Sequence, residues 1–150
     1  MSMGKADIIT KQYLTDNSVF ADAFNFFLYN GKQVLQPDQL RPLDTVAAET
    51  IFADTGTTIP VQKIRDNLKY LTMMTDDSVA YAILGIENQT DVHYAMPVRN
   101  MLYDAMEYSR QVQHISAKHR KEQHCDISSG EYLSGFYHSD RLLPVITLVI

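Results

Sequence analysis

Two apolar runs, Val61 to Met74 and Val79 to Asn88, flank the polar cluster Thr75-Asp76-Asp77-Ser78. Side chains that alternate between two faces along both runs are typical of two strands joined by a tight turn. With Asp76 and Asp77 as the turn residues, Asp66 in the first strand stands directly opposite Glu87 in the second. The pattern therefore predicts a β-hairpin with two carboxylates at the same height on one face.

The two opposed carboxylates need a compensating charge. Directly opposed side chains have Cβ atoms about 4.5 to 5.5 Å apart, where like charges repel. A divalent cation compensates both, because Mg²⁺ takes one or two carboxylate ligands and keeps several waters; Mn²⁺ is the alternative ion. The other interpretation is a hairpin slipped by one or two residues, with both acids at a wet edge of the sheet.

Before the hairpin, the pattern predicts one firm helix. Apolar residues recur at helical spacing after Ser18, a plausible N-cap, until the C-cap signal Asn30-Gly31, whereas residues 1–15 indicate an arm or a short helix. Prolines and polar residues indicate a loop over residues 32–45. Thr45 to Ala53 is rich in β-branched residues, which predicts a strand.

After the turn, Val79 to Ile86 is nearly all apolar, which predicts a central strand buried on both faces. Pro97 sits near the start of a long helix, Ser128 to Glu131 indicates a further helix start, and Leu142 to Ile150 indicates a fully buried strand. The long helix is expected to pack through one apolar stripe, formed by Val98, Met101, Leu102, Ala105, Tyr108, Val112 and Ile115.

This order of elements predicts one α/β domain over residues 16–150, with a central mixed sheet flanked by helices, after an N-terminal arm at residues 1–15. The chain has 150 residues, of which 45% are hydrophobic and 21% charged, an ordinary globular composition. Its apolar runs fall short of the roughly 20 residues of a membrane helix. The single cysteine, Cys125, indicates a reducing, cytoplasmic setting.

Charge and metal-ligand spacing argue against two classes of function. A net charge of −5 argues against an indiscriminately basic nucleic-acid binder. The basic residues between Lys118 and Lys121 fit either a local positive lobe or a solvated helix end. His114, His119, His124 and Cys125 lack the spacing and the second cysteine that a zinc site requires.

Further candidate site residues lie on the two main helices. Arg99 and Tyr103 are four residues apart, so they project from one face of the long helix near Gln89, and Arg110 follows on the same stripe. Arg99 fits a phosphate contact and an internal ion pair equally well. Asp22 on the first helix is either a solvated acid or a second metal-site carboxylate.

Several of these residues together match a known pattern: Asp66, then Glu87-Asn88-Gln89, Met96-Pro97-Val98-Arg99 with Tyr103, and Leu143 to Thr147. Over residues 16–150 the chain resembles the Rpn family of recombination-promoting nucleases and transposases, within the PD-(D/E)XK nuclease superfamily. The resemblance implies a restriction-endonuclease-like αβββαβ core and a DNA substrate.

The resemblance also implies roles for the candidate residues. Asp66, Glu87 and the backbone carbonyl of Asn88 would bind Mg²⁺, and Gln89, in place of the superfamily's usual lysine, would orient the attacking water. A neutral amide cannot stabilise charge as an ammonium does. The implied activity is hydrolysis of DNA phosphodiester bonds, linked to recombination or transposition. The alternative is an inactive nuclease-fold module that binds DNA or protein. Phosphate contacts are assigned to Arg99, Tyr103 and Arg110.

Members of this family continue beyond the last strand, so the resemblance implies a domain truncated at its C-terminus. Apolar surface and unpaired backbone groups are then expected along Val145 to Ile150. A homodimer through this surface would satisfy them.

Overall fold

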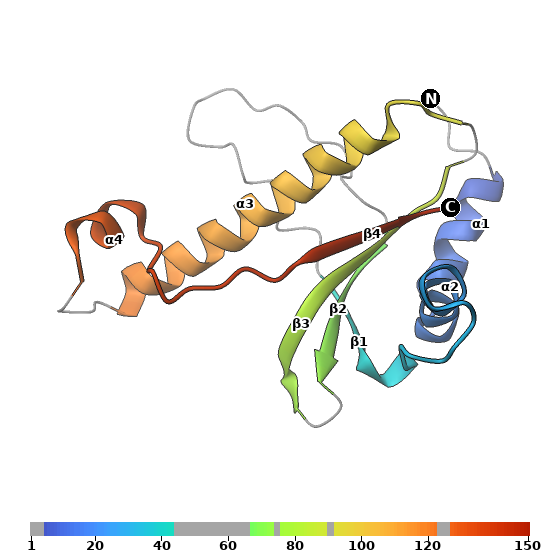
Figure 1. Cartoon of the computed structure of the whole chain (residues 1–150), viewed down its shortest axis with the longest axis horizontal. Helices are drawn as coiled ribbons and strands as arrows, with labels where there is room; N and C mark the ends of the chain where they lie inside the picture. The colour runs from blue at the N-terminus through green and yellow to red at the C-terminus, as the bar shows by residue number, and fades with distance from the viewer. Residues whose placement is uncertain (1–4, 44–66, 74–75, 90–91, 123–126) are drawn as a thin grey trace.

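The computed structural model describes residues 5–43, 67–73, 76–89, 92–122 and 127–150 (Figure 1). The predicted strand Thr45 to Ala53 lies outside them. The described helices are α1 (Lys5–Leu14), α2 (Asn17–Tyr29), α3 (Met96–Glu122) and α4 (Ser129–Ser134), with a 3-10 turn, η1 (Pro37–Gln39). One sheet contains β1 (Leu40–Pro42), β2 (Asn67–Met73), β3 (Asp76–Glu87) and β4 (Val145–Val149).

The first predicted helix is present as α2, and the expected N-terminal arm contains α1. The predicted N-cap is wrong, because Asp16 rather than Ser18 caps α2. The Asp16 carboxylate accepts hydrogen bonds from the backbone N–H groups of Ser18 at 2.7 Å and Val19 at 3.4 Å, which lower the pKa of Asp16. Asn30 ends the helix in the left-handed conformation, with φ of 52°, as the Asn30-Gly31 signal predicts.

The strands follow the order β1-β2-β3-β4, antiparallel between the first three and parallel between β3 and β4. The predicted loop at 32–45 is wrong for β1. Leu40 is fully buried and pairs with Leu71 of β2, so its burial favours a strand. Pro42 is compatible with this short strand, since β1 has a described neighbour on one side only and a missing N–H can face outward.

The register of β2 and β3 is the one that the hairpin pattern predicts. The two strands pair from Asn67 opposite Ile86 to Leu71 opposite Ala82. The prediction is therefore confirmed for these residues. β3 also occupies the predicted central position, and Ala82 to Glu87 are all buried.

The predicted position of the turn is wrong. Asp76 belongs to β3 and pairs with Met73, so Asp76 and Asp77 are strand residues. Beyond this pair, toward the far end of the hairpin, residues 77–79 and Tyr81 of β3 are left out of the pairing with β2. Extra residues on one strand form bulges, and these bulges restore the predicted pairing farther from the turn.

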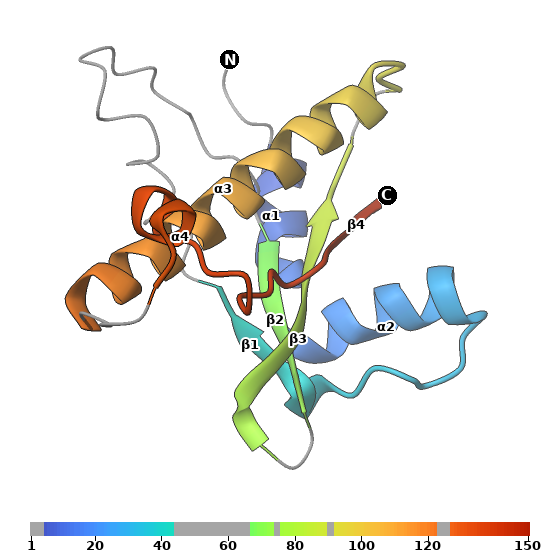
Figure 2. The same ribbon diagram turned by 60° about the vertical axis from the view of Figure 1, so that its left-hand side comes forward.

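Two helical layers enclose the sheet (Figures 1 and 2). Phe20 and Phe24 of α2 pack with Leu84 and Ile86 of β3, and burial of each such side chain contributes about 1.5–3 kcal/mol. On the other face α3 is held by polar contacts to the chain at β4. The Gln111 amide accepts from the Leu143 N–H at 2.7 Å and donates to the Leu143 carbonyl at 3.1 Å.

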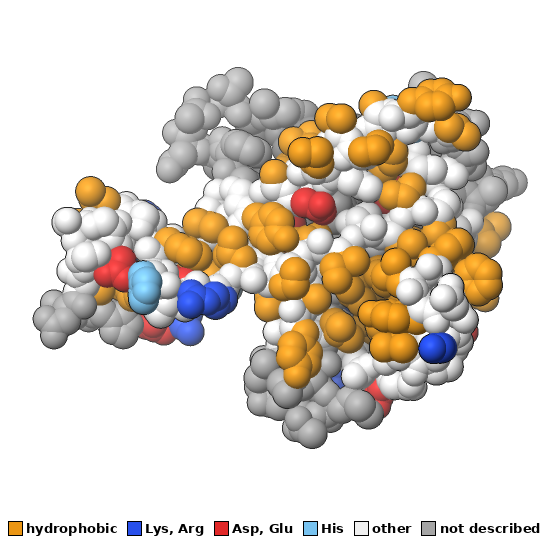
Figure 3. Space-filling view, viewed as in Figure 1, with side chains coloured by type: hydrophobic (Ala, Val, Ile, Leu, Met, Phe, Trp, Pro, Cys, Tyr) orange, Lys and Arg blue, Asp and Glu red, His pale blue; other side chains and the backbone are white. Residues whose placement is uncertain are grey.

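The apolar stripe predicted for α3 is wrong in its first half. Val98, Met101 and Leu102 are 67%, 71% and 58% exposed, whereas Met106 and Glu107 are buried. Figure 3 shows hydrophobic side chains on the outer surface along α3. Polar contacts such as those of Gln111 with Leu143 contribute to the rotation of the helix, and a hydrophobic pattern does not record them. No described helix is long and apolar enough to span a membrane.

β4 is parallel to β3 and has no described neighbour on its other side. The prediction of a fully buried strand is therefore wrong, and Ile146 and Val149 are 42% and 39% exposed. The helix start predicted at Ser128 is confirmed, since Ser128 caps α4. Gly135 ends α4 with φ of 66°, and a Cβ there would lie 3.0 Å from the Ser116 Cβ of α3. Glycine thus allows α4 to approach α3.

Candidate functional site

Glu87 ends the central strand β3 and points to the α3 side of the sheet. Side chains alternate along β3, so Glu87 shares a face with Ile83 and Gly85, whereas Leu84 and Ile86 pack toward α2. Glu87 is 8% exposed. A carboxylate this far from water requires partners that satisfy its charge.

Two polar side chains surround this carboxylate. The Gln89 Nε2 donates to the Glu87 Oε1 at 3.2 Å, and the Arg99 Nη2 lies 3.7 Å from the same oxygen. Backbone bonds hold the segment, since the Ile150 N–H donates to the Glu87 carbonyl at 3.0 Å and the Gln89 N–H donates to the Ile150 carbonyl at 2.8 Å. Asn88, half-buried between them, is fixed on both sides.

Arg99 and Tyr103 lie one turn apart at the start of α3, as their spacing predicts. The Tyr103 hydroxyl accepts from the Arg99 Nη2 at 2.7 Å and Nε at 3.2 Å, and the Arg99 Cζ is 5.5 Å from the ring centre. The hydrogen bond to Tyr103, and then the charge of Glu87, raise the pKa of Arg99. Because the Arg99 side chain is 41% exposed, a permanent cation lies at the solvent rim of the site.

Asp66, the other predicted metal ligand, lies outside the described residues. The described pairing of β2 with β3 ends at Asn67 opposite Ile86. Among the described residues no group of three or more His, Cys, Asp and Glu side chains could hold a metal ion. Glu87 and the Asn88 carbonyl nevertheless offer hard oxygen donors, which suit Mg²⁺.

Arg110 does not lie beside Arg99. It follows about 16 Å farther along α3, at 1.5 Å per residue, and its guanidinium contacts Glu107 on the same helix. Arg110 Nη2 and Nε donate to the Glu107 carboxylate at 2.6 to 3.1 Å, and the two side chains are 15% and 7% exposed. A bidentate pair this buried gives Arg110 an internal partner.

Asp22 lies in the other layer. It is exposed on α2 and accepts a hydrogen bond from the Gln33 Nε2 at 3.4 Å. Phe20 and Phe24 face the sheet from α2, on the side opposite to Glu87. The structure therefore brings Glu87, Gln89, Arg99 and Tyr103 together and leaves Asp22 apart from them.

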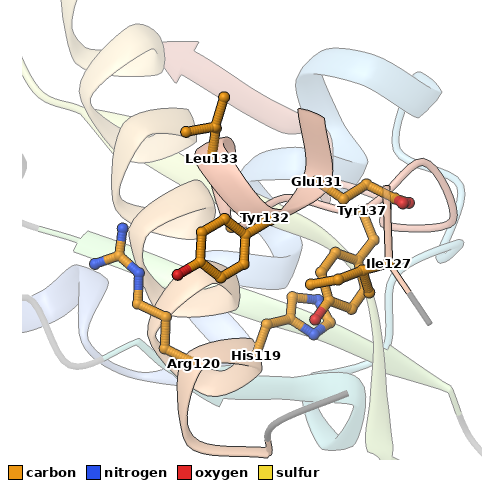
Figure 4. Close-up of a pocket in the computed structure, with 8 residues that line it drawn as sticks. His119, Arg120, Ile127, Glu131, Tyr132, Leu133 and Tyr137 are labelled. Carbon is orange, nitrogen blue, oxygen red and sulfur yellow. The ribbon is translucent and has the colours of Figure 1, made fainter. Parts of the chain in front are cut away.

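A pocket of about 620 Å³ lies between α4 and the C-terminal part of α3 (Figure 4). The His119 ring stacks on Tyr137 at 3.7 Å, and its Nε2 lies 3.0 Å from both oxygens of Asp140. Hydrogen bonds from the Ser128 and His138 N–H groups lower the pKa of Glu131 to about 2. These contacts hold α4 and the following loop to α3, so we assign the polar groups a structural role.

Sequence reasoning missed the buried Lys69 on β2, which is 4% exposed. Its Nζ donates to the Thr15 carbonyl at 2.7 Å and the Asn17 Oδ1 at 2.6 Å, and it lies 4.8 Å from the Phe20 ring centre. Burial lowers the pKa of Lys69, although Asp16 opposes the shift. The sequence feature that could have indicated this buried cation is a lysine placed among the apolar residues of a predicted strand.

Comparison of the chain with models of known protein families, with curated proteins and with solved structures finds no match. The chemistry of the site and the residue pattern therefore carry the functional proposal.

Proposed function

We propose that the chain is a metal-dependent DNA endonuclease with a restriction-endonuclease-like core, in which Asp66, Glu87 and the Asn88 carbonyl hold Mg²⁺. The observation that carries the proposal is the position of Glu87. It is a buried carboxylate at the end of the central strand, beside an amide and a cation. Buried charges are uncommon without a functional or structural partner.

The register of the hairpin supports a second carboxylate at this position. Asn67 pairs with Ile86 in an antiparallel ladder. We propose that the pairing continues by one residue, so that Asp66 faces Glu87. Two carboxylates this close repel each other, and a divalent cation between them offsets the repulsion.

Each neighbouring residue has a defined role in this proposal. A divalent cation supplies Lewis-acid polarisation of a phosphate and a more acidic water. The Gln89 amide, 3.2 Å from Glu87, orients the attacking water. Arg99 holds the scissile phosphate at the rim, and Tyr103 fixes the guanidinium for that contact. Arg110 supports α3 through Glu107 rather than contacting DNA.

A second candidate is an inactive nuclease-fold module that binds DNA or protein. The 3.7 Å contact of Arg99 with Glu87 favours it, because a protein cation already offsets the carboxylate. Gln89 in place of lysine favours it as well, since a neutral amide stabilises less charge in a transition state.

Cleavage of supercoiled plasmid DNA distinguishes the two candidates. We expect nicking by the wild type with Mg²⁺ or Mn²⁺ and none with chelator, and loss of nicking in Asp66→Ala and Glu87→Ala. The matched control is Asp22→Ala, an exposed acid on the other layer, which is expected to keep full activity. DNA binding without metal-dependent cleavage by the wild type would support the inactive module instead.

A further inference from the structure

The outer edge of β4 carries backbone groups that point away from β3. The Pro144 carbonyl and both backbone groups of Ile150 bond to β3 and the residues after it. Because these groups alternate along a strand, Val145, Thr147 and Val149 point outward. The Val145 N–H is taken by the Tyr108 hydroxyl at 3.1 Å. The outward N–H and carbonyl groups of Thr147 and Val149 have no hydrogen-bond partner in the described part of the chain.

Beyond the Tyr108 contact at Val145, the described strand itself has none of the usual protections of an edge. Natural edge strands carry charged side chains, prolines or bulges that prevent further pairing. From Val145 to Val149 the sequence is Val-Ile-Thr-Leu-Val, without charge or proline, and the ladder with β3 has no irregularity. Ile146 and Val149 are among its exposed side chains. Figure 3 shows hydrophobic side chains gathered over the region of β4 and α2.

The centre of this strand also holds an unsatisfied hydroxyl. Thr147 pairs with Gly85, so its side chain points to the α3 side. The Thr147 Oγ1 is buried, and the described residues offer it no hydrogen-bond partner. An unsatisfied buried hydroxyl costs about 1–3 kcal/mol, so a rotation of the Thr147 side chain that brings the hydroxyl to a hydrogen-bonding group of a partner would favour the complex.

We propose that the occupant of this edge is a second copy of the chain, whose β4 pairs antiparallel about a twofold axis at Thr147. Each Thr147 then exchanges both backbone hydrogen bonds with its counterpart, and each Val149 N–H donates to the partner's Val145 carbonyl. The Tyr108 hydroxyl already accepts from the Val145 N–H, so the ladder lacks the bond from that N–H to the partner's Val149 carbonyl. The sheets of the two copies become continuous.

The side chains explain why the occupant is another copy of this chain. Around a twofold axis at Thr147 the two threonines face each other, and opposed threonines form hydrogen bonds across strands. Ile146 opposes Leu148, and Val145 opposes Val149, so every pair is matched in polarity. The strand has no Lys or Arg to neutralise phosphate charge, which disfavours nucleic acid as the occupant. The proposal does not depend on the nuclease function.

A cross-link tests this register directly. In a Cys125→Ser background, Thr147→Cys places two thiols opposite each other, with Cα atoms about 5.5 Å apart, within the range of a disulfide. Ile146→Cys is the matched control, because the axis separates its two copies by about 8 Å, beyond that range. We expect rapid dimeric cross-linking by a mild oxidant for Thr147→Cys only. Equal cross-linking of both variants, or of neither, would overturn the register.

Analytical ultracentrifugation tests the dimer without any cross-link. We expect the wild type to dimerise with rising micromolar concentration and Thr147→Pro to remain monomeric. Proline removes only an N–H that points away from β3, so circular dichroism is expected to be unchanged. Ile146→Lys, which places a charge at an exposed position, is the second variant and should also be monomeric. A monomeric wild type, or a dimer retained in both folded variants, would contradict the proposal.

Discussion

Replacing Glu87 with glutamine separates a metal-binding carboxylate from a structural one. Without metal, the substitution removes the 3.7 Å ion pair with Arg99, whose side chain is 41% exposed. Solvent screens such a pair, and its contribution is about 0–1 kcal/mol. Glutamine still accepts from Gln89, and the proposed repulsion with Asp66 disappears. In chelator we therefore expect the free energy of unfolding to fall by less than about 1 kcal/mol, or to rise.

A bound metal ion is expected to change the difference in unfolding free energy between the wild type and Glu87→Gln. An ion that binds only the folded state at 100 times its dissociation constant stabilises the wild type by about 2.7 kcal/mol, and Glu87→Gln is expected to lose most of this gain. Urea denaturation with chelator and with Mn²⁺ measures both quantities. Glu107→Gln is the control: breaking its buried pair with Arg110 is expected to cost about 3–5 kcal/mol in both conditions while preserving the gain from metal. Equal metal stabilisation of wild type and Glu87→Gln would refute the reasoning.

Three further changes test other parts of the structure. Lys69→Met is expected to cost about 2 kcal/mol, because two acceptors lose their donor; the exposed Lys32→Met should change stability by less than about 0.5 kcal/mol. Burial lowers the pKa of Lys69 below 10.5, so the unfolded chain binds more protons than the folded chain just below that pH. The free energy of unfolding of the wild type should therefore rise as the pH increases toward 10.5. In urea titrations Lys69→Met should show no such rise. Arg99→Ala should weaken DNA binding for all sequences and make its salt dependence shallower; an unchanged slope in fluorescence anisotropy would assign Arg99 to the ion pair alone. Burial raises the pKa of Asp140, but hydrogen bonds from the Tyr137 N–H and His119 outweigh this effect, so the pKa is lowered. Asp140→Asn should therefore reduce the free energy of unfolding above pH 3.8, and its difference from the wild type should shrink as acid protonates the wild-type carboxylate. A difference in unfolding free energy that stays constant with pH would contradict this.

Alternation along the strands predicted which face each hairpin residue occupies, but the register was derived from a turn that the structure does not have. Asn67 lies opposite Ile86 as predicted, because the bulges near the turn offset the misplaced turn residues. The turn position was not predictable, because bulges at residues 77–79 and Tyr81 shift it without changing the far end of the hairpin. Propensity and alternation carry no signal for such compensating insertions.

The rotation of α3 was not predictable from its apolar stripe. The helix is held by polar contacts to residues distant in sequence, such as Gln111 with Leu143 and Tyr108 with Val145. The same limit applies to Glu107, whose burial depends on Arg110 rather than on hydrophobicity. By contrast, the contacts of Gln89 with Glu87 and of Arg99 with Tyr103 follow from spacings of two and four residues, which local geometry preserves.

A crystal soaked in Mn²⁺ tests the proposed site most directly, because anomalous scattering locates the ion independently of activity. The proposal predicts one peak about 2.1 to 2.2 Å from carboxylate oxygens of both Asp66 and Glu87 and from the Asn88 carbonyl, with Arg99 displaced from Glu87. No peak at saturating Mn²⁺, with Arg99 still beside Glu87 and Asp66 on another face, would contradict it.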